Sequence, residues 1–289
     1  MDHKMIDHLC VIGVGLIGGS LALALKKAGY VKKVTGLGRS IENLEKAQRL
    51  GVIDHYETDY AKAVTHADVI LVAVPIGSME AVFRKIDPHL QKNTIVTDAG
   101  SAKHTVIEAA KKIFGRKINQ FVPGHPIAGT EKSGAEAAFD SLYQKRRVIL
   151  TPLEENSKED INVIKNMWKI SGATVDEMGA RHHDLVLAGT SHLPHVLAFA
   201  LVDCLNNVDD VEEIFKYAAG GFRDFTRIAS SDPVMWRDIC LNNSEAILAM
   251  MHSYQAKIDM LKTAMEQSDA DALLKIFTDA KKARDDFCM

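Results

Sequence analysis

The stretch LCVIGVGLIGGS (residues 9–20) passes from a short apolar run into closely spaced glycines and then into an amphipathic segment. Gly13, Gly15 and Gly18 have the spacing G-x-G-x-x-G. In that pattern the first glycine permits a tight turn, the second lets a pyrophosphate approach the backbone, and the third lets a helix pack closely on a strand. The helix N-terminus then faces the phosphate charge. A mere glycine-rich turn is the alternative, but the position between a strand and a helix favours dinucleotide binding.

The second strand candidate ends in TGLGRS (residues 35–40), where NAD-binding proteins usually carry a carboxylate that holds the ribose hydroxyl. Gly38 occupies that place, and Arg39 and Ser40 follow. A guanidinium can pair with a 2′-phosphate and no carboxylate repels it, so the sequence favours NADP over NAD. The alternative is a solvated surface arginine. The predicted cofactor-binding residues are Gly13, Gly15, Leu16, Ile17, Gly18, Arg39, Ser40, Val74 and Pro75.

Strand and helix patterns alternate through the first half of the chain. Strand candidates are residues 9–14, 34–37, 69–74, 94–97, 120–122 and 148–150, and helix candidates are residues 16–28, 41–50, 78–86 and 103–114. This order predicts an α/β, doubly wound, mainly parallel sheet with helices on both faces. From about residue 181 the pattern is helical. We therefore expect a dinucleotide-binding domain at residues 1–178 and an all-α domain at residues 179–289.

The helical half contains one long apolar periodicity. Asp232 and Pro233 form an N-cap and first-turn pair, and apolar residues recur on one helix face as far as Met265. A helix of about 30 residues would be roughly 45 Å long, more than one small domain can cover. A partner subunit is expected to cover the rest, giving a homodimer. Ser268 is expected to cap a final helix, with Asp271 at the capping-box position.

Composition limits the classes of protein to consider. The chain has 289 residues, of which 47% are hydrophobic and 25% charged, with a net charge of −3 and no long basic block. This is the balance of a folded globular protein, and no nucleic-acid partner is expected. We expect no membrane span and no secretory signal, and the four separated cysteines indicate neither a zinc site nor a disulfide framework. A cytoplasmic location follows as the simplest expectation.

Two segments after strand candidates carry polar side chains. TDAGSAK (residues 97–103) contains Ser101, and GHPIAGTEKSG (residues 124–134) contains His125 on what we expect to be a tight turn. Ligands of doubly wound sheets lie beyond the carboxyl ends of the strands, so both side chains are expected in one crevice. A dehydrogenase that oxidises an alcohol needs a base for the hydroxyl proton, and His125 is the candidate. The alternative is an imidazole that only ties down a loop.

The helical half offers two further clusters. SHLPH (residues 191–195) puts His192 and His195 on one helix face, but no third ligand at convincing spacing accompanies them, so we expect no metal. Residues 220–238 hold Arg223, Arg227 and Arg237 among aromatics, together with Trp236. An arginine that faces the crevice would bind a carboxylate through two parallel hydrogen bonds. The alternative is that all three are ordinary surface arginines. For Trp236 we favour an interface over the core.

Five segments in the same order carry a family resemblance over nearly the whole chain: GVGLIGGSLALALK, TDAGS, GHPIAGTEKSG, TSHLPHVLAFALVD and GGFRDFTRIASSDPVMWRDI. The chain resembles the prephenate and arogenate, or cyclohexadienyl, dehydrogenases of tyrosine biosynthesis. The resemblance implies a Rossmann-like N-terminal domain and an all-α C-terminal dimerisation domain. It also implies oxidation of a cyclohexadienol with NAD⁺ or NADP⁺ and loss of carbon dioxide. The product is 4-hydroxyphenylpyruvate from prephenate or tyrosine from arogenate, and the preference between them stays open.

The resemblance also implies roles for single residues. His125 matches the catalytic histidine that accepts the ring hydroxyl proton, and Ser101 matches the serine that hydrogen-bonds this histidine and the substrate hydroxyl. Arg227 matches the arginine that binds a substrate carboxylate, and His195 matches a histidine that orients the substrate. The other substrate-binding matches are Thr130, Glu131, Gly220, Asp224 and Trp236, the last of which reaches across the dimer in the family.

Two alternatives remain beside this interpretation. Another two-domain NADP-dependent dehydrogenase of β-hydroxy acids or imines would more often use a lysine as its acid or base. A non-catalytic NADP-sensing protein would leave Ser101, His125 and Arg227 without a joint purpose. Little sequence follows the helical half, so no attached regulatory domain is expected, whereas direct inhibition by tyrosine at the active site stays open.

Overall fold

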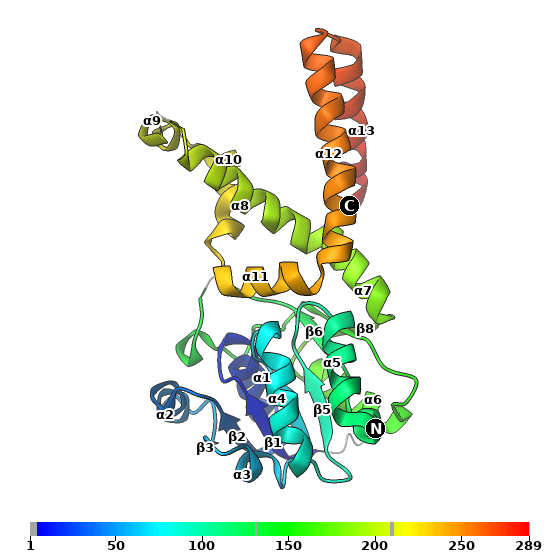
Figure 1. Cartoon of the computed structure of the whole chain (residues 1–289). Coiled ribbons are helices and arrows are strands. Elements are labelled where there is room, and N and C mark those ends of the chain that lie inside the picture. The colour runs from blue at the N-terminus through cyan, green and yellow to red at the C-terminus, as the bar shows by residue number, and fades with distance from the viewer. Residues whose placement is uncertain (1–4, 131, 209–210, 289) are drawn as a thin grey trace. The chain divides into compact units, whose positions relative to one another are not determined.

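The computed structural model describes residues 5–130, 132–208 and 211–288. A five-stranded parallel sheet in the order β3-β2-β1-β4-β5 forms the centre of the first half (Figure 1). Its strands are β1 (Ile6–Ile12), β2 (Val31–Leu37), β3 (His55–Glu57), β4 (Val69–Val72) and β5 (Ile95–Asp98). Since strand order reverses on the two sides of β1, the sheet has a switch point between β1 and β4, where doubly wound folds bind ligands.

Helices cover both faces of this sheet, as the alternation of strand side chains requires. Leu9 and Val11 of β1 belong to a core with α1 (Leu16–Lys27), α2 (Ile41–Arg49) and α6 (Lys158–Ile170). The intervening residues Cys10 and Ile12 belong to a core with α3 (Tyr60–Val64), α4 (Ile76–Ile86) and α5 (His104–Phe114). Successive side chains of a strand point to opposite faces, so each apolar run is buried on both sides. The doubly wound prediction is confirmed.

A second, three-stranded sheet follows, in the order β6-β7-β8. Its strands are β6 (Gly124–Ile127), β7 (Arg147–Leu150) and β8 (Thr174–Glu177), with β6 antiparallel and β8 parallel to β7. The strand candidate at residues 120–122 is only an isolated bridge between Phe121 and Val96. The expectation of a tight turn around His125 is also wrong, because His125 pairs with Ile149 inside β6. Pro126 is tolerated there because β6 is an edge strand.

The rest of the chain is helical. Its helices are α7 (Ala180–Leu187), α8 (Leu193–Asn206), α9 (Val211–Lys216), α10 (Gly220–Thr226), α11 (Pro233–Asn242), α12 (Ser244–Glu266) and α13 (Ala270–Cys288). Shorter helical turns are η1 (Asp87–His89), η2 (Gly115–Gln120), η3 (Ala135–Ala137), η4 (Ala188–His192) and η5 (Arg227–Ser230), of which η4 is π-helical. Because η4 continues α7 into α8, residues 180–206 form one helical stretch.

This stretch of 27 residues is long and apolar enough to cross a membrane by length and composition, which the sequence analysis did not anticipate. Only 22% of its most apolar window is buried inside the chain. The same composition suits a helix that another protein surface covers.

The long helix expected from Pro233 to Met265 is instead two helices that meet at Asn243. The Asn243 side chain is buried and donates hydrogen bonds to the carbonyl oxygen of Asp184 and to Nδ1 of His192. These tertiary contacts outweigh helix continuity. The final helix is capped by Asp269, whose Oδ1 accepts from the Ala272 amide at 2.9 Å, and not by Ser268.

By its internal contacts the chain divides into two compact units, Met1–Ser244 and Glu245–Met289. The first unit contains both sheets and the helices as far as α11. The second contains nearly all of α12 and the whole described part of α13. All the side chains of the candidate site described below lie in the first unit.

Candidate active site

The glycine turn after β1 has the shape that a dinucleotide pyrophosphate needs. Gly13 has a φ of 95°, and a Cβ atom there would lie 2.4 Å from the carbonyl oxygen of Ala73. A Cβ at Gly18 would lie 2.6 Å from the Gly13 carbonyl oxygen, whereas one at Gly15 would meet nothing within 4 Å. Gly15 is also the N-cap of α1 and offers no side chain to its first amides. The turn therefore leaves open space at an uncapped helix N-terminus, which fits an anionic ligand.

Leu16 and Ile17 fix the first turn of α1. Leu16 is buried in the core, and the Ile17 carbonyl oxygen accepts a hydrogen bond from the buried Tyr143 hydroxyl at 2.6 Å. Their backbone amides thus stay next to the glycine turn, in keeping with the predicted cofactor contact.

The other predicted cofactor residues lie at the carboxyl ends of β2 and β4. Arg39 is exposed after β2, and its charge opposes the rise that burial causes in the pKa of Tyr60. Ser40 caps α2 by accepting from the Asn43 amide at 3.2 Å. Val74 and Pro75 follow β4, and Pro75 is the N-cap of α4. The structure thus brings these residues to the edge of the sheet that also carries Gly13.

A buried ion pair holds together the segments that carry Ser101 and His125. Asp98, at the end of β5, accepts from the amides of Gly100 at 2.8 Å and Gly124 at 3.1 Å. Its carboxylate also accepts from Nζ of Lys103, which donates a further hydrogen bond to the Gly124 carbonyl oxygen at 2.7 Å. Both charged side chains are fully buried. Sequence reasoning missed this pair, although TDAGSAK contains both residues.

His125 lies in β6 with only 8% of its surface exposed. Its Nδ1 is 2.9 Å from Nε2 of His183, and the two rings meet edge to face with centroids 5.1 Å apart. Among the described residues, no side-chain hydrogen bond joins Ser101 to His125. The partner expected from the family resemblance is therefore replaced in this structure by a second histidine.

His183 and the neighbouring Asp184 extend this contact into α7. Nδ1 of His183 lies 2.8 Å from Oδ1 of Asp184. The same carboxylate accepts from the backbone amides of Lys103 and His104, each at 2.8 Å, and so caps the start of α5. The local sequence carries only a weak signal for this pair, HHD at the start of a helical stretch (residues 182–184).

Burial lowers the pKa values of the imidazoles in this cluster and so disfavours their charged forms. Burial, followed by the charges of His183, Lys103 and His192, holds the pKa of His125 well below its ordinary value of 6.5. Burial also lowers the pKa of His183, and it lowers the pKa of His192 to about 4. Burial raises the pKa of Asp184, but hydrogen bonds from His183 and the two α5 amides outweigh it, so the carboxyl stays below its ordinary value. At neutral pH the cluster is thus neutral imidazole beside carboxylate.

A second group of rings surrounds Trp236. His195 stacks on its indole, with centroids 3.8 Å apart and planes 20° apart, and His192 lies 6.1 Å away edge to face. Trp236 is only 7% exposed and belongs to the core that contains α4 and α5. The expectation that Trp236 lies at an interface is therefore wrong for this chain, because its own core buries it. The two histidines do share a face, as predicted from their spacing.

Two buried polar atoms of this group have no partner among the described residues: Nε2 of His192 and Nε1 of Trp236. Such orphaned groups are expensive unless a water or a ligand completes them. Both atoms belong to the group of rings that also contains His195.

Three of the predicted substrate-binding residues lie on α10 and η5, and Arg227 is the one expected to bind a carboxylate. Gly220, Asp224 and Arg227 are all exposed in the single chain. Burial lowers the pKa of His195, the hydrogen bond to the Ser191 carbonyl oxygen raises it, and the charge of Arg227 lowers it further. Because the charge of Arg227 acts on His195, these two side chains are neighbours. Thus Arg227 lies near His195, which stacks on Trp236, and their roles toward a substrate stay a prediction.

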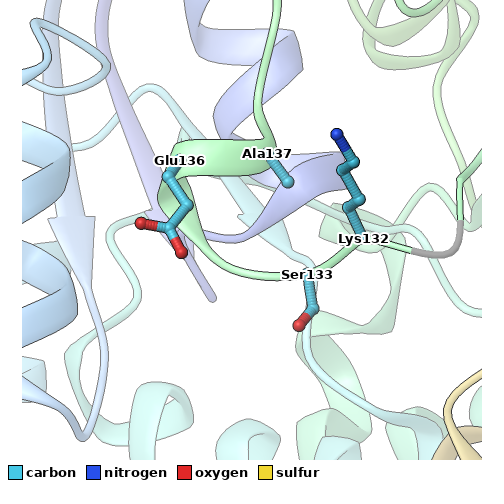
Figure 2. A pocket seen from close by; sticks show the side chains of 4 residues that line it. All are labelled: Lys132, Ser133, Glu136 and Ala137. Atoms are coloured by element: carbon cyan, nitrogen blue, oxygen red, sulfur yellow. The ribbon is translucent and has the colours of Figure 1, made fainter.

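The segment after β6 carries the last predicted contacts. Thr130 is exposed, and its Oγ1 accepts from the Lys132 amide at 3.2 Å, whereas Glu131 lies outside the described residues. The next residues line a hollow of about 510 Å³. Figure 2 shows the side chains of its lining residues Lys132, Ser133, Glu136 and Ala137. Glu136 is tied to Lys46 of α2 at 2.7 Å, so this loop lies against the helix that follows Arg39.

No group of three histidine, cysteine, aspartate or glutamate side chains within the described residues has the arrangement of a metal site. The cluster around His125 is instead a hydrogen-bonded chain that ends in a carboxylate. Such an arrangement suits acceptance of a proton from a bound alcohol.

Comparisons with known proteins identify the family of this chain. The family described as "Prephenate dehydrogenase, nucleotide-binding domain" matches residues 21–177, and "Prephenate dehydrogenase, dimerization domain" matches residues 179–279. A prephenate dehydrogenase of Bacillus subtilis is 38% identical over 98% of this chain and 76% of its own length. A cyclohexadienyl dehydrogenase of Zymomonas mobilis is 38% identical over 97% of this chain and 96% of its own length.

A solved structure resembles the whole chain. Prephenate dehydrogenase from A. aeolicus, in complex with hydroxyphenyl propionate and NAD⁺, has a TM-score of 0.90 and 36% identity over 97% of this chain and 98% of that one. Both halves of the chain, its sequence and its fold thus agree with the resemblance carried by the five segments. The chain therefore belongs to the prephenate dehydrogenase family of NAD(P)-dependent oxidoreductases.

Proposed function

We propose that the chain oxidises and decarboxylates prephenate to 4-hydroxyphenylpyruvate, with transfer of a hydride to a nicotinamide dinucleotide. The observation that carries this proposal is the buried His125, whose pKa burial holds below its ordinary value. His125 is linked through His183 to Asp184 and held by Asp98 close to the nucleotide edge of the sheet. A base in that state can accept the proton of a ring hydroxyl.

The protons and electrons of this reaction balance without a further acid. The chemistry that a bound nicotinamide supplies is acceptance of hydride from the carbon that bears the hydroxyl. His125 takes the hydroxyl proton as that carbon becomes a carbonyl. Loss of the ring carboxylate as carbon dioxide then leaves its bonding electron pair in the ring, which becomes aromatic. The oxygen becomes a phenolate and takes the proton back from His125, so the chain mainly orients the substrate and holds one proton.

We assign the remaining roles by position. Arg227 pairs with a substrate carboxylate, and His195 orients the substrate from the face of Trp236. Thr130, Glu131, Gly220 and Asp224 complete the substrate-binding residues. Ser101 contacts the substrate hydroxyl in the complex, and its position two residues before the buried Lys103 supports that role.

For the cofactor we propose a preference for NADP⁺ over NAD⁺. The support is local: Gly38 stands where a carboxylate would bind the ribose, and the exposed Arg39 follows at the end of β2. A 2′-phosphate there would meet a guanidinium and no nearby acid of the same turn.

The family's dimerisation domain and the exposed apolar stretch at residues 180–206 support a homodimer. We propose a domain boundary at residues 178–179, directly after β8, where strands give way to helices. A cytoplasmic enzyme without membrane or nucleic-acid partners is the simplest setting for this chemistry.

The test is a four-way assay of the full chain with prephenate or arogenate and with NAD⁺ or NADP⁺, following the absorbance of the reduced nicotinamide. Turnover of prephenate, faster with NADP⁺, is expected. Turnover of arogenate alone would contradict the substrate, and a strong NAD⁺ preference would contradict the cofactor proposal. Cofactor binding without turnover of either substrate would instead indicate a sensor, and turnover of a β-hydroxy acid or imine another dehydrogenase.

A further inference from the structure

Three side chains behind the candidate base form a continuous chain of contacts. His125 Nδ1 meets His183 Nε2 at 2.9 Å, and His183 Nδ1 meets Asp184 Oδ1 at 2.8 Å. His183 is fully buried, and Asp184 is only 5% exposed. Solvent therefore does not compete for these hydrogen bonds.

The carboxylate decides the direction of every hydrogen bond in this chain. An ionised carboxylate only accepts hydrogen bonds, so Nδ1 of His183 must carry the proton of the neutral ring. Nε2 of His183 is then unprotonated and offers a lone pair. That lone pair accepts from Nδ1 of His125, which must then carry a proton. The remaining nitrogen of a neutral His125, Nε2, is consequently the acceptor.

We infer that His183 and Asp184 are a positioning pair that fixes His125 as the Nδ1–H tautomer and stabilises the positive charge it gains when Nε2 takes the substrate proton. This inference rests on the proposed function for the identity of the proton donor. The tautomer itself does not depend on that identity.

A purely structural role explains the pair less well. The Asp184 carboxylate already receives two amides from the start of α5, so capping that helix does not require His183. Both ring nitrogens of His183 face titratable side chains, and the ring has no hydrogen bond to a backbone carbonyl among the described residues. An apolar side chain of similar size would fill a purely structural position without the cost of burying an imidazole.

The surroundings also favour transmission of charge through His183. The groups that face this region are Lys103 and Asp98, which pair with each other, His192, and Asp184 itself. Asp184 is thus the carboxylate in direct contact with the two-ring chain, and its low pKa keeps it charged. A carboxylate behind a general-base histidine has this orienting and stabilising role in hydrolytic triads.

Two substitutions at residue 183 separate orientation from charge transmission. His183→Leu removes the acceptor for His125 Nδ1–H and the link to Asp184, so kcat is expected to fall about 10²-fold or more. His183→Gln keeps an amide oxygen that can accept from Nδ1–H but cannot relay charge, so a smaller loss of about tenfold is expected. KM for prephenate should stay within about twofold in both, because neither change touches Arg227 or His195. His182→Gln, on the exposed neighbour, is the matched control and should retain wild-type kinetics.

A substrate-free measurement tests the tautomer directly. In wild-type protein with ¹⁵N-labelled histidine, the His125 signals, identified by their loss in His125→Asn, should show a protonated Nδ1 and an unprotonated Nε2 at pH 7. In Asp184→Asn the side-chain oxygen can take the place of Oδ1 and still accept from His183 and from the Lys103 amide, so the tautomer of His125 should persist. The neutral amide no longer stabilises the positive charge that His125 gains, so kcat should fall by about 10- to 100-fold.

A proton on Nε2 of His125 in the wild type would overturn the inference, even if a variant fails to fold. So would His183→Leu with kcat within threefold of wild type. If wild-type protein does not oxidise prephenate but shows the expected tautomer, the proposed function fails and the positioning pair stands.

Discussion

The carboxylate of Asp98 and the ammonium of Lys103 form a fully buried ion pair within the segment that carries Ser101, and both side chains also hydrogen-bond the backbone of Gly124, in the strand that carries His125. Burial lowers the pKa of Lys103, while Asp98 and, to a lesser extent, Asp184 oppose that shift. Because Asp98 accepts from the Gly124 amide and Lys103 donates to the Gly124 carbonyl oxygen, the pair sets where β6 lies relative to β5.

Lys103→Met is therefore expected to leave a buried carboxylate without its counter-ion. The free energy of unfolding should fall by about 3 to 5 kcal/mol, and turnover should fall with it because Gly124 loses a tether beside His125. Urea denaturation measures the change. Lys112→Met, on the exposed face of α5, which begins directly after Lys103, is the control and should cost less than about 1 kcal/mol. Equal effects of the two substitutions would contradict the importance of the buried pair.

His125→Asn should abolish the proton acceptor while leaving the glycine turn intact. The dissociation constant for the dinucleotide, measured by fluorescence titration, should change little. Turnover should drop by about 10² to 10⁴, or roughly 3 to 5 kcal/mol in the activation barrier. Unchanged turnover would remove His125 from the role of base.

Arg227→Ala tests the proposed carboxylate clamp. The substitution should chiefly raise KM for prephenate, because a charge-assisted pair to a carboxylate contributes about 1.5 to 3 kcal/mol, or roughly 10- to 100-fold. Arg223→Ala, one helical turn earlier and also exposed, is the matched control and should alter KM little. Arg227 would lose its assigned role if both variants showed the same KM.

Gly38→Asp should turn the cofactor preference toward NAD⁺. A Cβ at this position would meet only Leu44, at 3.5 Å, which is ordinary contact, so the new side chain fits without strain. The added carboxylate can bind the ribose hydroxyl and repels a 2′-phosphate. Gly38→Ala serves as the control for the added bulk, and kcat/KM with each cofactor is the measurement. The assignment fails if Gly38→Asp and Gly38→Ala have the same cofactor ratio.

The sequence predicted the parts of this structure that depend on local pattern. Apolar runs such as Leu9–Ile12 must be buried on both sides, and Gly13 and Gly18 stand where any Cβ would strike a backbone oxygen. The same reasoning could not find contacts between distant segments. Asp184 reaches amides about 80 residues earlier in the chain, and Asn243 ends a helix because its side chain is needed at His192.

The conformation around His125 also depends on contacts between distant segments. Glycine and proline beside it favoured a turn, but pairing with β7 made the segment a strand. Its ring partner His183 could not be predicted either, because nothing in the local sequence HHD indicates that His183 faces β6. Tertiary hydrogen bonds decided both outcomes.

Acid should destabilise the fold from about pH 6.5 downward, because it protonates histidines that are buried as neutral groups. His192 has a folded pKa of about 4 against 6.5 when unfolded, so the unfolded chain binds more protons throughout that interval. Stability is then fully present above pH 6.5 and is lost as the pH falls toward 4, by about 3 kcal/mol from this group alone. The lowered pKa values of His125 and His183 act in the same direction, whereas the lowered pKa of Asp184 acts only below 3.8. Urea unfolding at pH 7, 6, 5 and 4 measures this slope, and His192→Gln should flatten it. A free energy of unfolding that stays constant from pH 7 to pH 5 would show that these imidazoles are not buried as neutral groups.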